Sequence, residues 1–154
     1  MKLIKFCSAY KAAIPVFIVL CMLPAYSCKP PVANSEQQSP EQVWKKANIH
    51  SYEFLLRINC FCSPETIGPH KIQVKADTIF SVNGIPYDRA KSYVILKTIP
   101  DLFRFIKESD ARTPFRKSVV YDSAYGFPTS LYYDYDERIA DEEIGYIISE
   151  FRKN

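Results

Sequence analysis

The sequence predicts an α+β fold in which two helices pack on one face of an antiparallel sheet. Two segments, beginning near residues 39 and 98, combine helix-start signals with apolar side chains at helical spacing. Apolar and polar residues alternate in segments that follow each of them, as in half-buried strands. Short loops join these segments, and the order helix–strands–helix–strands is typical of this fold class.

The first predicted helix begins after Ser39, which is a suitable N-cap residue. Pro40 then occupies the first helical position, and Gln42 lies three residues after the cap, where it completes a capping box. A short apolar stripe follows, and the helix is expected to end near Asn48. The stripe consists of Val43, Trp44 and Ala47.

Residues 51–62 form the first predicted strand, because alternate side chains from Tyr52 to Ile58 are apolar. Continuing this alternation places Cys60 and Cys62 on the same apolar face. Residues 63–69 contain two prolines and a glycine, which end the strand.

A second and a third strand are predicted to form a hairpin. The second strand directs Ile72, Val74 and Ala76 inward, and the third covers residues 79–82. A turn at Asp77 and Thr78 joins them, although it lacks the glycine that marks the strongest hairpin turns. Residues 83–86, which contain Asn-Gly, form the next turn.

The second predicted helix follows residues 90–96, which are either a strand or irregular. Thr98 and Asp101 form a capping box at its start. Its apolar face consists of Ile99, Leu102, Phe103 and Ile106, and the helix is expected to end within residues 109–114. Three strands close the chain, at 117–122, 129–135 and 143–151.

Composition restricts the classes of function. The chain has 154 residues, of which 47% are apolar and 14% aromatic, enough for one domain with a hydrophobic core. Its formal net charge is +3, but residues 1–27 contain three lysines and no acidic residue, so the remainder is formally neutral. A neutral domain lacks the basic face that phosphate contacts require, which argues against nucleic acid as a partner.

Residues 1–27 have the parts of a secretory signal peptide: lysines, a 12-residue apolar run, and small residues before Cys28. The run is shorter than the roughly 20 residues that a transmembrane helix needs. The small residues Ala25 and Ser27 lie three positions and one position before Cys28, as in the lipobox of bacterial lipoproteins, which this segment resembles. The usual lipobox has Leu three positions before the cysteine and a small residue two before it, where this chain has Ala25 and Tyr26. We expect cleavage before Cys28 and lipidation of its thiol; simple secretion or a retained anchor is the alternative.

Residues 28–40 are rich in Pro, Ser, Gln and Asn, which predicts an extended tether. The predicted organisation is therefore a signal peptide at 1–27, a tether at 28–40 and one folded domain at 41–154. Acyl chains on Cys28 would hold the domain at a membrane. This organisation predicts a protein of the bacterial cell envelope, on a periplasmic or surface face.

Cys60-Phe61-Cys62 is the most prominent local motif of the predicted domain. In an oxidising compartment the two cysteines can form a structural disulfide, but two buried free thiols and redox or metal chemistry remain open. Cα atoms two residues apart in a strand lie roughly 6.5–7 Å apart, so a bond between Cys60 and Cys62 requires a bulge or a bend. A thiol-redox protein that uses this pair is the alternative function.

Metal and catalytic chemistry have little support in the sequence. His50 and His70 could join the two cysteines in a zinc site, but the spacing matches no compact zinc motif. The acidic residues within 134–143 offer oxygen ligands for Ca²⁺ without the spacing of an EF-hand. A nucleophile elbow and a Gly-rich phosphate loop are both absent from the sequence. We therefore predict no catalytic residue, no metal and no cofactor.

Tyr132 and Tyr133 are candidates for binding. Because they are adjacent in a predicted strand, one of them must face away from the core. An exposed Tyr can serve as a recognition anchor, although strands are rich in aromatic residues for reasons of packing alone.

The order of several short motifs resembles a known family. The motifs are Trp44, Tyr52-Glu53-Phe54, Cys60-Phe61-Cys62, Ile72-Gln73-Val74, the helix start at 98–103, Val120-Tyr121-Asp122, Gly126-Phe127-Pro128 and Asp141-Glu142-Glu143-Ile144. Over residues 41–150 this order resembles the uncharacterised bacterial envelope family called domain of unknown function 6174. The resemblance implies no particular activity, ligand or catalytic residue. The family usually has Gly in the turn after its second strand, where this chain has Asp77 and Thr78.

These observations together predict a lipid-anchored envelope protein that is a non-enzymatic binding or assembly module. The expected partners are the membrane, through the lipid on Cys28, and another envelope protein.

Overall fold

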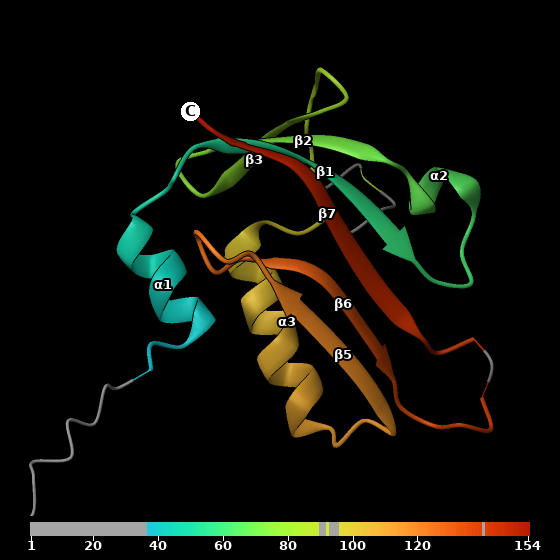
Figure 1. The fold of residues 1–154 in the computed structure, drawn as a ribbon. Helices are drawn as coiled ribbons and strands as arrows, with labels where there is room; N and C mark the ends of the chain where they lie inside the picture. Colours follow the sequence, from blue (N-terminus) through green and yellow to red (C-terminus); the bar gives the residue numbers. More distant parts are fainter. Residues whose placement is uncertain (1–36, 90–91, 93–95, 140) are drawn as a thin grey trace, which may run out of the picture. The chain divides into compact units, whose positions relative to one another are not determined.

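A computed structural model describes residues 37–154 except 90–91, 93–95 and 140 (Figure 1). Its central element is one seven-stranded antiparallel sheet with the strand order β4-β3-β2-β1-β7-β6-β5. The strands are β1 (Tyr52–Asn59), β2 (His70–Lys75), β3 (Thr78–Val82), β4 (Ile85–Pro86), β5 (Arg116–Tyr121), β6 (Pro128–Asp134) and β7 (Ile144–Lys153). The predicted signal peptide, Cys28 and the tether up to residue 36 lie outside the described residues.

The predicted α+β fold class is wrong, because the fold is essentially a β-sheet with a few short helices. The helices are α1 (Pro40–Ala47), α2 (Pro64–Ile67) and α3 (Ile99–Ala111). Local periodicity identifies single elements but not how many strands join one sheet. The last strand, β7, pairs with β1 and with β6, and thereby joins all strands into one sheet. None of the described helices has the length and hydropathy needed to cross a membrane.

The predicted starts of both longer helices are confirmed. The Ser39 hydroxyl accepts a hydrogen bond from the Gln42 N–H, and the Gln42 side chain accepts one from the Ser39 N–H. Thr98 and Asp101 make the same reciprocal pair at α3. Helix α1 is followed by Asn48 in the left-handed conformation (φ 52°), which is a common helix end.

The first strand is confirmed, but it ends earlier than the alternation suggested. Tyr52, Phe54, Leu56 and Ile58 are all buried, as predicted. The strand stops at Asn59. Cys60 is half-buried and still packs against the core, as predicted, whereas Cys62 is exposed and does not. Pro64, the first of the two prolines after the strand, also begins the four-residue helix α2, which the sequence analysis did not predict.

The turn between β2 and β3 differs from the prediction by one residue. Lys75 pairs with Thr78, so the two turn residues are Ala76 and Asp77. Both have positive φ angles (46° and 61°), as the right-handed twist of a two-residue hairpin requires. Ala76 is therefore exposed rather than inward-facing. The predicted turn at 83–86 is a similar hairpin, whose second strand, β4, was missed.

The hydrophobic core lies where α1 and α3 contact the side chains of the central strands. Trp44 of α1 packs edge-on against Tyr52 of β1, at a centroid distance of 5.5 Å. The Tyr52 hydroxyl accepts a hydrogen bond from the N–H of Ile99 (3.1 Å), an N–H group at the start of α3 with no partner inside the helix. Burial raises the pKa of this hydroxyl. The predicted apolar face of α3 is buried, as expected: Ile99, Leu102, Phe103 and Ile106.

Candidate functional site

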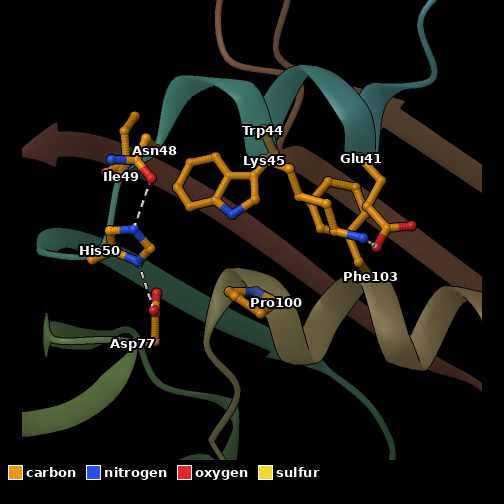
Figure 2. Close-up of a pocket in the computed structure, with 9 residues that line it drawn as sticks. All are labelled: Glu41, Trp44, Lys45, Asn48, Ile49, His50, Asp77, Pro100 and Phe103. Carbon is orange, nitrogen blue, oxygen red and sulfur yellow. Dashed lines mark hydrogen bonds and ion pairs between the residues drawn. The ribbon is translucent and has the colours of Figure 1, made fainter.

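A cleft of about 330 Å³ lies beside α1, near the start of α3 and the β2–β3 turn (Figure 2). Its floor is apolar and its rim is polar. The lining residues are Glu41, Trp44, Lys45, Asn48, Ile49, His50, Asp77, Pro100 and Phe103.

The floor of the cleft is rigid because Trp44 belongs to an aromatic cluster. The indole ring contacts Phe127 and Phe151 edge-on as well as Tyr52, with centroid distances of 6.1, 6.0 and 5.5 Å. Only 5% of Trp44 and 8% of Phe103 is exposed, so a ligand would meet the edges of fixed side chains. A fixed floor lowers the conformational entropy lost on binding.

One end of the rim is built around His50, which follows α1. Its Nδ1 lies 2.7 Å from Oδ2 of Asp77, and its Nε2 lies 3.0 Å from Oδ1 of Asn48 (Figure 2). The left-handed backbone at Asn48 and the hairpin turn at Asp77 bring these side chains to the imidazole ring. The N–H of Asp77 also donates to the His50 carbonyl, at 2.9 Å. The His50 ring is therefore held in one orientation.

The other end of the rim carries the Glu41–Lys45 ion pair, with 2.6 Å between Oε1 and Nζ. Both side chains are largely exposed, so the pair adds little stability. The rim therefore presents charges of both signs above an apolar floor. This combination suits binding of a partly apolar ligand with polar ends.

The residues considered for a zinc site are not brought together. His50 is paired with Asp77, whereas the His70 ring lies 2.9 Å from the carbonyl oxygen of Thr66 in α2. Within the described part of the chain, no group of three or more potential ligands is arranged to hold a metal ion. In the acidic segment, Asp136 forms an ion pair with Arg138.

The two cysteines of the Cys-Phe-Cys motif are at disulfide distance, with 2.04 Å between their sulfur atoms and 5.3 Å between their Cα atoms. The bend that such a bond requires is present, because the N–H of Cys62 donates to the carbonyl of Cys60 (2.9 Å). Phe61 is at the tip of this bend and 86% exposed.

The two tyrosines of β6 differ as their adjacency predicts. Tyr133 is fully buried, and its hydroxyl donates to Asp110 of α3 at 3.0 Å. Burial, followed by this contact with Asp110, raises the pKa of Tyr133. Tyr132 is the partly exposed one and lies beside Cys60 and Phe61 in a second cavity. Tyr133 is thus a core residue, and Tyr132 remains available for contacts.

Sequence reasoning missed the cleft. Trp44 and Phe103 were correctly assigned to apolar helix faces, but His50 was considered only as a possible zinc ligand. His50 and Asp77, which form one end of the rim, are 27 residues apart in the sequence, and the β2–β3 turn brings Asp77 to the imidazole ring. The only signal of the cleft in the sequence was the presence of two polar residues, Asn48 and His50, directly after α1.

The fold and the site define a small antiparallel β-sheet domain with a helix-bordered cleft. The chain belongs to the family of unknown function DUF6174, whose profile matches residues 36–153. This match confirms the resemblance found in the sequence. No curated protein and no solved structure matches the chain.

Proposed function

We propose that this chain is a lipid-anchored protein of the bacterial cell envelope and that its domain binds a small ligand in the cleft beside α1. The observation that carries the binding role is the contrast between the apolar floor at Trp44 and Phe103 and the charged rim. At one end the Asp77 carboxylate, which pairs with His50 through Oδ2, keeps its other oxygen for a ligand, and Glu41 and Lys45 carry charges of both signs at the other end. A suitable ligand has an aliphatic or aromatic centre and polar groups at its ends, as in a short peptide.

The alternative thiol-redox role has weaker support. Redox-active cysteines are activated by a cation or by the N-terminus of a helix, which stabilise the attacking thiolate. Here the Cys60–Cys62 pair follows a strand and shares its cavity with the Glu143 carboxylate, which disfavours a thiolate. We therefore assign the disulfide a structural role within this proposal.

The anchor is tested by replacing Cys28 with Ala in cells fed radiolabelled palmitate. We expect the wild-type chain to take up label and the Cys28→Ala chain to take up none, because the Cys28 thiol is the proposed attachment point. Cys21→Ala is the matched control and should retain the label, since Cys21 precedes the proposed cleavage point. An unlabelled wild type, or equal label in Cys28→Ala, would contradict lipidation.

The cleft is tested by fluorescence, because Trp44 is the only tryptophan in the chain and lines the site. We expect leucyl-leucine or phenylalanyl-leucine to change its emission in a saturable way. Asp77→Asn should weaken that binding by about fivefold, the loss of one hydrogen bond to a charged group. Lys46→Ala, an exposed change on α1 outside the cleft, should leave binding unaltered. No saturable change with any hydrophobic dipeptide would refute the cleft as a peptide site.

A further inference from the structure

The bend at Cys60–Phe61–Cys62 presents an aromatic ring in a restrained position. The ring of Phe61 is 86% exposed, more than any other large apolar side chain that the structure describes. Its backbone is held by the disulfide on both sides and by the hydrogen bond from the N–H of Cys62 to the carbonyl of Cys60. Because the backbone is already ordered, a partner that contacts Phe61 loses little additional conformational entropy.

A cavity of about 290 Å³ lies beside this ring, lined by Asn59, Cys60, Phe61, Tyr132 and Glu143. Gly145 of β7 lies between two of the lining strands, because it pairs with both Asn59 and Tyr132. A Cβ atom at Gly145 would be 2.9 Å from the Leu131 carbonyl oxygen, 3.3 Å from Cβ of Asn59 and 3.7 Å from Cδ2 of Tyr132. Glycine at this position therefore lets the strands that carry Asn59 and Tyr132 lie close to β7.

The one charged residue that lines this cavity, Glu143, is negative. No hydrogen bond or ion pair joins the Glu143 carboxylate to another residue of the described chain. In the same acidic segment, Asp134 Oδ1 and Glu142 Oε1 are buried without a hydrogen-bond partner. Burial, and then the Asp134 and Glu143 carboxylates, raise the pKa of Tyr132, and Arg116 opposes this effect.

Two other exposed phenylalanines, Phe80 and Phe115, each have a cationic side chain near the ring, and Phe61 does not. Lys75 Nζ lies 3.7 Å from the centroid of the Phe80 ring, and the Arg116 guanidinium lies 5.6 Å from that of Phe115. Within the part of the chain that the structure describes, Phe61 has neither a cation nor a second ring against it. Its face is therefore free for a cation supplied from outside.

We propose that the corner formed by Phe61, Tyr132 and Glu143 binds a cationic group, an ammonium or guanidinium such as the end of a Lys or Arg side chain. The two aromatic rings supply cation–π contacts and the Glu143 carboxylate supplies the opposite charge. This site is separate from the cleft at Trp44 and does not depend on the function proposed for it. The same chemistry is found on a basic segment of a protein and on a free amine.

The test uses the whole chain and three capped amino acids as probes: the amides of N-acetyl-lysine, N-acetyl-arginine and N-acetyl-norleucine. Norleucine has the chain length of lysine without its charge. We expect the Phe61 and Tyr132 ring resonances to shift with the two cationic probes, with at least about tenfold weaker binding of norleucine. Binding should also weaken as salt is raised, because the site is exposed. Equal binding of all three probes, or no binding of any, would overturn the proposal.

Variants assign the effect to this corner. Phe61→Leu, which keeps an apolar side chain but removes the ring, and Glu143→Gln, which removes only the charge, should each weaken lysine binding by about fivefold. Phe80→Leu makes the same change at another exposed ring, in β3, and should change nothing. Asp77→Asn should also change nothing, so a failure here is distinguishable from a failure of the cleft. Unaltered binding in both Phe61→Leu and Glu143→Gln would refute the assignment.

A second comparison separates the two sources of the cation. If a tetrapeptide Gly-Lys-Lys-Gly binds more tightly than ethylamine, the cation comes from a protein segment that makes further contacts. If the two bind equally, the corner recognises the amine alone. Both outcomes support a cation site, whereas binding of neither overturns it.

Discussion

Replacing Phe54 with Ala is expected to lower the free energy of unfolding by about 3–5 kcal/mol, the usual cost of removing a fully buried ring. Phe54 is 1% exposed in the central strand β1 and stacks on Tyr52 at a centroid distance of 5.8 Å. Its strand pairs with both β2 and β7, so neighbouring backbones cannot move in to fill the cavity. Urea unfolding, followed by the emission of Trp44, measures the change.

Phe61→Ala is the matched control for this experiment. It makes the same chemical change seven positions along the chain, at a ring that is 86% exposed. The free energy of unfolding should therefore change by no more than about 0.5 kcal/mol. If the two variants were equally stable, β1 would not occupy the centre of the sheet.

Local features of the fold could be predicted from the sequence because they depend on neighbouring residues. The capping boxes at Ser39 and Thr98 need only a cap and a side chain three positions later. The buried face of β1 follows from the two-residue repeat between Tyr52 and Ile58. Both kinds of signal are complete within about eight residues of chain, and both were confirmed.

Features that depend on distant parts of the chain could not be predicted in this way. Strand β7 lies between β1 and β6. Its pairing with β1 joins residues that are more than eighty positions apart in the sequence, such as Arg57 and Ile147. The fold class was wrong for this reason, since joining all strands in one sheet leaves the helices as minor elements. The shift of the β2–β3 turn to Ala76 and Asp77 has a different cause, because neither residue is the glycine expected at positive φ.

The candidate sites also combine features that depend on neighbouring residues with features that depend on distant ones. The Cys60–Cys62 motif and the outward position of Tyr132 could be found from adjacent residues. Their contact with Glu143 arises only because Gly145 pairs with both Asn59 and Tyr132. The cleft is non-local as well, because the hydrogen-bonding partner of His50 lies in the β2–β3 turn, 27 residues further along the chain.

Gly126→Ala is expected to detach α1 from the sheet and to lower the free energy of unfolding by about 2–4 kcal/mol. Gly126 has a φ of 74°, a left-handed conformation that costs an alanine about 1 kcal/mol. A Cβ atom there would also overlap the backbone carbonyl oxygen of Pro40 and lie 3.0 Å from Cβ of Val43. Because Pro40 begins α1, relief requires the whole helix to move, which would expose Trp44 and shift its emission to longer wavelength.

Gly84→Ala separates the two causes, because Gly84 also has a positive φ of 80° but no atom lies within 4 Å of the added Cβ. It should cost only the backbone conformational energy, about 1 kcal/mol, and leave the Trp44 emission unchanged. The difference between the two variants then measures how tightly α1 is held against the 122–128 loop. If both variants lost the same stability with the same emission, α1 would not pack on Gly126. The wall of the cleft would then be free to move, and a preformed ligand site could not be maintained there.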